Sequence, residues 1–403
     1  AGSYPAFYFS SARPIKVLKG AFKNSNAQVT PRKILVVLQF SFAIVLIIST
    51  IIVRQQIQHA QDRDAGYDRN NLVYIFTQGD VSKNYNLIKH DLIGSGAAVA
   101  VAKTFSPITR VWNSISGLSW PGSTESDKKF NFLQFSVDAD FVKTTGARLV
   151  QGRDIDITGF PTDSTAMLLN EAAVKIMRLQ DPIGKIVKNE DGVNCHVVGV
   201  IKDFIIESPY DNIAPMVIQC PKEGFGTVHF KLNPANAISD DLVRAEKVFR
   251  LYNPQYPFEY YFADHFYDMK FKEEKREGAL GGLFAGLAIF ISCLGLFGLA
   301  ACMAESRIKE IGVRKVLGAS VARITALLSK DFVKLVSISL LIASPIAWFA
   351  MDHWLQGFTY RVQISLWIFL AAGSLAILIA LLTVSYQAKR AAMANPVKSL
   401  RSE

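Results

Sequence analysis

Residues 34–53 read ILVVLQFSFAIVLIISTIIV, a run with no charged side chain, and this run decides the class of fold. A helix of this length crosses about 30 Å of bilayer hydrocarbon. Three further apolar runs follow, at residues 279–304, 332–351 and 364–384. A buried core helix could explain one such run but not four, and a signal peptide would not begin so far into the chain. We therefore predict an α-helical membrane protein with four transmembrane helices.

The flanking charges predict the orientation. Residues 1–33 carry cations and no acid, and further cations lie in residues 305–331 and 385–403. Lys and Arg are enriched in cytoplasmic loops, so these three segments are expected in the cytoplasm and the long segment 54–278 outside. The net charge of +10 is then explained by topology, without nucleic-acid binding.

Residues 54–278 are expected to form a large mixed α/β extracytoplasmic domain with helical stalks, inserted between helices 1 and 2. Strand patterns occur in NLVYIF (71–76), TAMLLN (165–170), NCHVVGVI (194–201), APMVIQC (214–220) and GTVHFKL (226–232). Asn170 is a candidate helix N-cap, and a capped helix is expected from Ser239. The charged stretch 263–280 is expected to be helical and to continue directly into the second span. A short outer loop at 352–363 completes the layout.

No catalytic or metal-binding constellation is found in the sequence. The histidines are far apart, and the chain has no G-x-S-x-G motif, no H-E-x-x-H motif and no P-loop. Cys195 and Cys220 are expected on adjacent strands, where either a disulfide or two buried free thiols would fit. We therefore expect neither an enzyme nor a metal site.

Small residues mark the second span. Gly282 and Gly286 form a G-x-x-x-G pair, which lets helices approach closely. This face could pack against another span or against a second copy of the chain, and a general abundance of glycine in membrane helices would also explain it.

The sharpest local pattern is ESRIKEIGVRKVLGAS at residues 305–320. On a helix, Arg307, Glu310 and Arg314 share one face, and Glu310 can pair with Arg314 at i,i+4. Gly318 is expected to end this helix, and Ser320 to cap the next one. Such a short charged helix could dock a soluble partner or could be an ordinary interfacial loop.

This run resembles the signature of the FtsX-like permeases, the membrane subunits of ABC transporters of the MacB and LolC/LolE type. Ser306 departs from that signature, where Arg is usual. The resemblance extends over almost the whole chain, through QGRDID (151–156), DPIGK (181–185), VVGVIKDF (197–204) and the tail AKRAAMANPVKSLRSE (388–403). It implies a MacB-like periplasmic core domain in residues 54–278 and a bacterial inner-membrane location.

The resemblance also implies a coupling helix that contacts a separate ABC ATPase subunit. The positions concerned are Glu305, Arg307, Glu310, Ile311, Gly312, Arg314, Lys315, Gly318 and Ala319. ATP would be bound only by that partner, and this chain would need no cofactor. Movement of the spans would then be relayed to the outer domain by mechanotransmission.

Two functions fit this layout. The first is efflux or extraction of a peptide, lipoprotein or amphiphile. The alternative is a non-transporting signal relay that activates a periplasmic cell-wall hydrolase or a sensor kinase. Either could involve a periplasmic or outer-membrane partner besides membrane lipid.

Residues 3–20 and 385–402 align at a constant offset, with identities that include the pattern Pro-x-Lys-x-Leu. Two basic segments could agree by composition, but a duplicated module is favoured. We therefore expect this chain to be the C-terminal half of an eight-span bacterial permease, with residues 1–33 following an upstream span. Its partner would then be the other half or, for a four-span protein, a second copy.

Overall fold

The computed structural model describes residues 25–189, 191–221, 223–307, 310–311, 313–314 and 317–393. These residues divide into two compact units. One, called here the membrane unit, contains the described residues up to Ile57, Glu274–Gly357 and those from Val362 onward. The other, called the α/β unit, contains Gln58–Glu273 and Phe358–Arg361.

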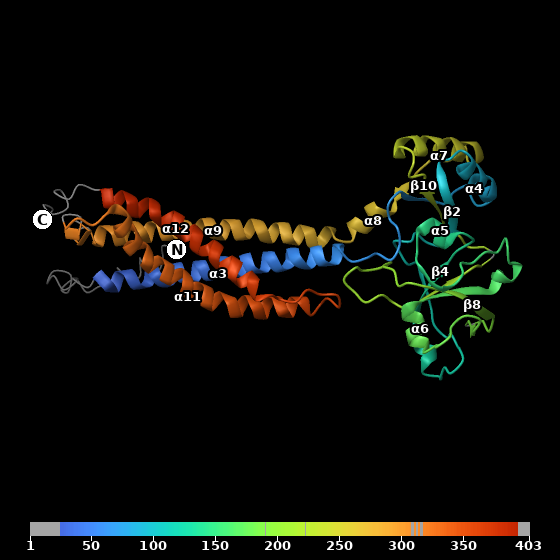
Figure 1. The fold of residues 1–403 in the computed structure, drawn as a ribbon, viewed down its shortest axis with the longest axis horizontal. Helices are drawn as coiled ribbons and strands as arrows, with labels where there is room; N and C mark the ends of the chain where they lie inside the picture. Colours follow the sequence, from blue (N-terminus) through green and yellow to red (C-terminus); the bar gives the residue numbers. More distant parts are fainter. Residues whose placement is uncertain are drawn as a thin grey trace. The chain divides into compact units, whose positions relative to one another are not determined.

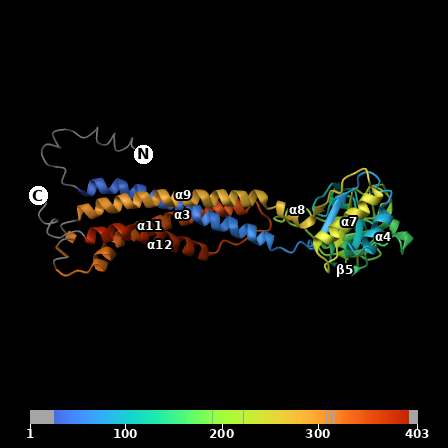
Figure 2. The same ribbon diagram turned by 90° about the horizontal axis from the view of Figure 1, so that it is seen from above.

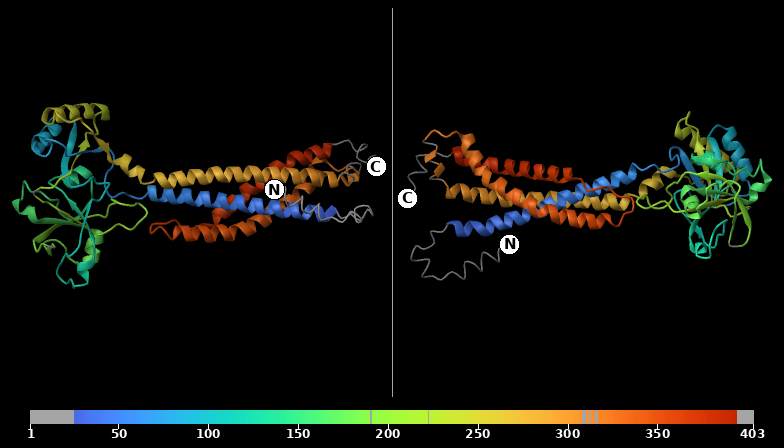
Figure 3. Two further views of the ribbon diagram at one scale, coloured as in Figure 1. Left: turned by 180° about the vertical axis from the view of Figure 1, so that it is seen from behind. Right: turned by 60° about the horizontal axis from the view of Figure 1, so that its bottom comes forward.

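The membrane unit consists of long helices that run side by side (Figures 1 and 2). They are α3 (Ser25–Gln61), α9 (Lys272–Ser306), α11 (Val321–Leu355) and α12 (Leu366–Met393). All four are long and apolar enough to cross a membrane, and each overlaps one of the predicted spans. The predicted class of fold, with four membrane helices and an α/β insertion after the first, is therefore confirmed (Figure 3).

Hydroxyl groups connect α3 to α11 inside the membrane unit. Ser339 Oγ donates to the Val37 carbonyl at 3.1 Å, and Ser41 Oγ donates to the Ser339 carbonyl at 3.3 Å. Such bonds satisfy hydroxyls that have no water to pair with inside a bilayer. They fix the register of the first span against the third.

The α/β unit holds two sheets, which the sequence patterns do not separate. The four-stranded sheet is antiparallel and has the order β11 (Tyr261–Phe262), β1 (Leu72–Phe76), β10 (Thr227–Leu232), β2 (Ala98–Thr104). Helices α4 (Tyr85–Gly94) and α7 (Ile238–Tyr252) lie on it (Figure 1). Ile88, Leu92 and Phe249 from these helices are buried in one core with Phe230 of β10.

The seven-stranded sheet is mixed. Its order is β3 (Asn113–Ile115), β4 (Phe132–Ser136), β9 (Met216–Gln219), β6 (Ala166–Asn170), β8 (Asn194–Ile201), β5 (Leu149–Gly152), with β7 (Ile186–Lys188) also paired to β8. Helix α6 (Glu171–Met177) packs on this sheet. Helices α5 (Phe141–Thr145) and α8 (Ala263–Met269) contribute Phe141 and Tyr267 to a different core. A second core, which includes Leu72 of β1, Phe135 of β4 and Tyr267 of α8, joins the two sheets.

Local predictions for this unit are partly confirmed. The Asn170 side chain caps α6, because its oxygen accepts the Ala173 N–H at 2.9 Å. The helix predicted from Ser239 is present as α7, which begins at Ile238. Its N-cap residue is Ala237, which makes no side-chain cap, so the predicted cap is wrong. The helix predicted over 263–280 is interrupted, since α8 ends at Met269 and α9 begins at Lys272.

The expected adjacency of the two cysteine strands is wrong. Strand β6 lies between β8, which carries Cys195, and β9, which Cys220 follows. Both thiols are free and buried. The reason is a crossover: consecutive strands in the chain need not be neighbours in a mixed sheet.

Candidate functional site

Between α9 and α11, the described residues form a helical turn, called here the turn between α9 and α11. Ile311 N–H bonds to the Arg307 carbonyl at 2.9 Å and Leu317 N–H to the Val313 carbonyl at 3.0 Å, both in the helical i→i−4 pattern. Gly318 has φ of +87°, a left-handed conformation that favours glycine. Ala319 N–H then bonds back to the Arg314 carbonyl at 3.0 Å, which is the long bond of a Schellman ending.

Helix α11 starts immediately after this turn. The Ser320 side chain accepts the N–H of Arg323 at 3.3 Å, so Ser320 is the N-cap. The predicted helix end at Gly318 and the predicted cap at Ser320 are both confirmed. Gly318 ends one helical segment and Ser320 caps the next, so only Ala319 lies between them.

Two ion pairs hold the turn. Arg314 contacts Glu310 at 2.7 Å within the turn, as predicted. Arg307 contacts Asp331 of α11 at 3.0 Å, a pairing that the helical-face prediction did not include. All four side chains are about one-third to one-half exposed, so each pair contributes at most about 1 kcal/mol. The Arg307–Asp331 pair links the C-terminal end of α9 to α11.

A hollow of about 340 Å³ lies beside the turn and combines basic and apolar side chains. It is lined by Arg314, Leu317, Gly318, Ala319, Arg323, Ile324 and Leu327. Leu317 is 79% exposed, an unusual position for leucine unless something covers it. This surface would suit a partner that offers carboxylates around an apolar contact.

The other predicted site residues are distributed unevenly. Glu305 is exposed at the end of α9, and Ile311 is buried at 9% exposure. Gly312 and Lys315 lie outside the described residues. Gly282 of the G-x-x-x-G pair approaches α3, since a Cβ added there would lie 3.8 Å from Thr50 Cγ2. A Cβ added at Gly286 would have no described atom within 4 Å.

The most deeply buried histidine of the α/β unit is His229, which is part of its core. His229 is fully buried, and burial lowers its pKa to about 3, so the ring is neutral. Its Nε2 accepts the Ile108 N–H at 3.2 Å, and its Nδ1 lies 3.1 Å from Thr104 Oγ1. Within the described parts of the chain, no group of three or more His, Cys, Asp or Glu side chains could hold a metal ion.

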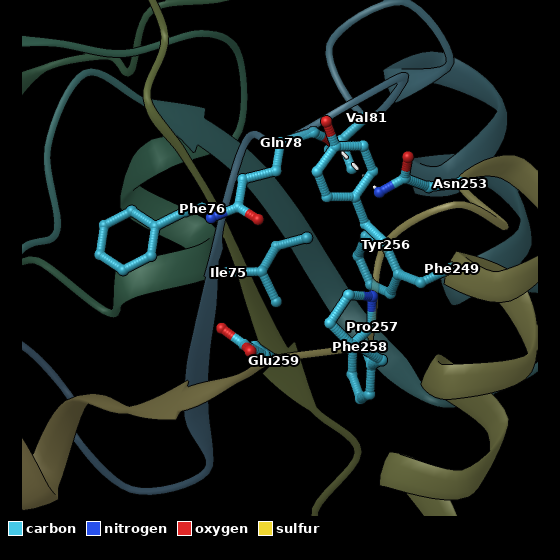
Figure 4. A pocket seen from close by; sticks show the side chains of 10 residues that line it. All are labelled: Ile75, Phe76, Gln78, Val81, Phe249, Asn253, Tyr256, Pro257, Phe258 and Glu259. Carbon is cyan, nitrogen blue, oxygen red and sulfur yellow. Dashed lines mark hydrogen bonds between the residues drawn. The ribbon is translucent and has the colours of Figure 1, made fainter.

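The hollow drawn in Figure 4 is too small for a ligand. It has about 20 Å³, which is room for about one water molecule. Asn253 donates to the Gln78 carbonyl at 3.2 Å and accepts the Asp80 N–H at 3.0 Å, so its amide closes the loop after β1. This hollow is a packing feature of the four-stranded sheet.

The loop between α11 and α12 carries a feature that the sequence patterns missed. Its residues Phe358–Arg361 belong to the α/β unit, although both flanking helices belong to the membrane unit. The Tyr360 ring stacks on His59 with centroids 4.3 Å apart and lies 4.4 Å from the Arg63 guanidinium carbon. The sequence signal for this contact is weak: two aromatic residues, Phe358 and Tyr360, stand close together in a short loop.

Comparison with known proteins finds a matching family over the part of the chain that contains the turn between α9 and α11. Residues 282–396 match the family described as FtsX-like permease C-terminal. None of the curated proteins compared with the chain matches it. The periplasmic region of MacB from Actinobacillus actinomycetemcomitans is 15% identical with a TM-score of 0.36, over 52% of this chain and 96% of that one. The extracellular domain of the noncanonic ABC-type transporter YknZ from Gram-positive bacteria is 14% identical with a TM-score of 0.33, over 47% of this chain and 97% of that one.

Proposed function

We propose that this chain is the membrane subunit of an ABC transporter whose ATPase is a separate protein, because residues 282–396 match the family described as FtsX-like permease C-terminal. The matched residues contain α11, α12, most of α9 and the whole turn between α9 and α11. The observation that carries the proposal is the exposed basic and apolar surface of that turn. A partner ATPase would bind there and supply the nucleotide chemistry.

The ends of the turn support a role in transmitting movement. A Schellman ending at Gly318 and an N-cap at Ser320 leave little freedom between the turn and α11. The Arg307–Asp331 pair fastens the exit of α9 to α11. A displacement of the turn would therefore move both helices together rather than bend a loop.

Three segments of the chain would carry this movement to the α/β unit. Helix α3 passes from the membrane unit into the α/β unit at its C-terminal end, and α9 does so at its N-terminal end. The third connection is the loop Phe358–Arg361 between α11 and α12. We propose that ATP-driven movement of the spans repositions the α/β unit outside a bacterial inner membrane, for efflux or extraction of a peptide, lipoprotein or other amphiphile.

A second membrane subunit completes the proposal. Apolar side chains cover much of α9, and Leu283, Phe284, Leu287 and Phe290 are each more than half exposed in the isolated chain. The open space beside Gly286 lies on the same helix. Lipid covers part of this surface, and a second permease half or a second copy would cover the rest.

Photocrosslinking in the host cell tests the coupling surface. A benzoylphenylalanine residue replaces Leu317, and a control carries the same residue at Leu251, which is 68% exposed on α7 of the α/β unit. We expect a crosslink from position 317 to a protein with a P-loop ATPase sequence, and none from position 251. Crosslinks from position 317 that contain no such ATPase would contradict the proposal.

A further inference from the structure

A second hollow, in the α/β unit, brings two cations together beside apolar side chains. It measures about 410 Å³, within the usual range for a small-ligand site. Its lining includes Arg110 and Lys270 as cations, Glu207 as the one carboxylate, and Val111, Phe266 and Met269 as apolar residues. The hollow lies where α8 ends, two residues before α9 begins at Lys272.

Lys270 is held rigidly in this hollow. Its Nζ donates to the backbone carbonyls of Ile206 and Glu207. Burial lowers the pKa of Lys270 to about 8; the Glu207 carboxylate opposes this shift, and the nearby positive charge of Arg110 adds to it. The two cations are thus close enough to repel each other, which is a cost that a bound anion would remove.

Arg110 is placed by its backbone rather than by a partner for its charge. Its N–H bonds to the Pro107 carbonyl at 2.9 Å, and its own carbonyl accepts Ser106 Oγ at 3.0 Å. The guanidinium carbon lies 5.6 Å from the centre of the Phe266 ring. Among the described residues, no carboxylate forms an ion pair with Arg110, so its planar group of donors is available to a phosphate or carboxylate.

The apolar side of the hollow is open to solvent. Met269 is 45% exposed, and Trp112, which follows the lining residue Val111, is 46% exposed. An apolar chain laid across these side chains would remove that surface from water, and a flexible Met adapts to chains of different shape.

We propose that this hollow binds an anionic amphiphile, with its phosphate or carboxylate between Arg110 and Lys270 and its alkyl chain on Phe266 and Met269. This rests on the proposed function and names the chemical class of its substrate or effector. Because Lys270 lies two residues before α9 begins at Lys272, occupancy would act on the helix that leads to the turn between α9 and α11.

Binding of octyl phosphate to the full chain in phosphatidylcholine nanodiscs tests this inference. We expect saturable binding of octyl phosphate, no detectable binding of octanol, and much weaker binding of inorganic phosphate, because the alkyl chain contributes to affinity. Arg110→Gln should weaken binding about tenfold or more, the effect of losing charge-assisted bonds. Glu207→Gln should tighten it severalfold by removing the one repelling charge.

Lys247→Gln is the matched control, since Lys247 is exposed on α7 of the same unit and does not line the hollow. Unchanged affinity in the Arg110→Gln variant, or binding of octanol as tight as that of octyl phosphate, would overturn the inference. Repeating the titration with phosphatidylglycerol in the nanodiscs separates two sources of the ligand: competition points to a bilayer lipid, and no competition to a free amphiphile. The titration needs no ATPase, so its failure is distinct from a failure of the crosslinking at Leu317.

Discussion

The backbone N–H of Tyr360 donates a hydrogen bond to the backbone carbonyl of Tyr210 at 2.7 Å. The Phe358 ring lies 5.2 Å from that of Tyr210, centre to centre. These contacts place the loop between α11 and α12 in the α/β unit. The last two spans are therefore connected to that unit through their loop, in addition to the two helices that enter it directly.

Replacing Tyr360 by Ala should release this loop. The change removes the stacking on His59 and the contact with Arg63, at a cost of about 1–2 kcal/mol for the two interactions together. Amide hydrogen exchange of the segment around residue 360, measured by mass spectrometry in nanodiscs, should become faster. The Tyr360→Phe variant keeps the ring and should exchange more slowly than the Tyr360→Ala variant. Equal exchange in the Ala variant would show that these ring contacts do not hold the loop.

Charge reversal in the turn between α9 and α11 should reduce the stimulation of ATP hydrolysis by the permease without unfolding the chain. Glu310→Lys and Arg314→Glu each disrupt a half-exposed pair whose loss costs only about 0.5 kcal/mol, so the chain should stay folded. Stimulation of the partner ATPase in the reconstituted complex should fall strongly in both variants. Normal stimulation in both would refute the assignment of the turn as a coupling surface. Glu246→Lys on α7, which breaks the similar Glu246–Arg250 pair, is the control.

Asp138 should make the stability of the α/β unit depend on pH. Burial raises the pKa of its carboxyl to about 6, against the opposing effects of Tyr85 and of two lysines. A raised folded-state pKa contributes stability that is present below the unfolded-state value of 3.8 and is lost as pH rises through about 6. Asp138→Asn should lack this loss because an amide does not titrate. Its oxygen can still accept the Lys103 N–H that Asp138 accepts at 2.8 Å, so the fold should be kept.

The measurement is equilibrium unfolding followed by tryptophan fluorescence at about pH 5 and about pH 7. Between these conditions the variant should gain about 1–2 kcal/mol relative to the wild type, from roughly one pKa unit of titration. The exposed Asp240→Asn variant serves as the control. A wild-type pH slope in Asp138→Asn would show that another group dominates.

Two glycines of α9 should respond differently to the same substitution. A Cβ added at Gly295 would lie 2.5 Å from Gln39 Oε1 of α3, whereas one added at Gly286 would meet no described atom within 4 Å. Gly295→Val should therefore lower the stability of the single chain by about 1–3 kcal/mol through overpacking. Gly286→Val should leave it unchanged and should weaken association with a second membrane subunit.

Thermal unfolding in nanodiscs and the yield of inter-subunit cysteine crosslinks measure the two effects separately. If Gly286→Val preserves both, the Gly286 side of α9 faces lipid and the subunit interface lies elsewhere. If Gly295→Val unfolds at the wild-type temperature, the Gln39 side chain moves aside without cost.

The class of fold was predictable because its signals are local. An uncharged run such as residues 34–53 must form a helix in a bilayer, since no other structure satisfies a single segment's backbone there. The signals for the end of the turn between α9 and α11 are equally local, because Gly318 and Ser320 each act within a few residues of their own position. Asn170 was predictable as a cap for the same reason.

The pairings of distant residues were not predictable. Strand β10 follows β9 in the chain but joins β1 and β2 in the other sheet, and β6 separates the strands of the two cysteines. The partner of Arg307 is Asp331, which lies on the next helix rather than on the predicted face.

The sequence alone thus determined the four spans, the inserted α/β region and the capped turn, because hydrophobic length and capping chemistry depend on neighbouring residues. Only the tertiary structure decided that the α11–α12 loop joins the α/β unit and that Arg110 and Lys270 share one hollow. Residues 110 and 270 are separated by most of that unit's chain, and a pairing at such a distance depends on how two sheets pack, which no local pattern encodes.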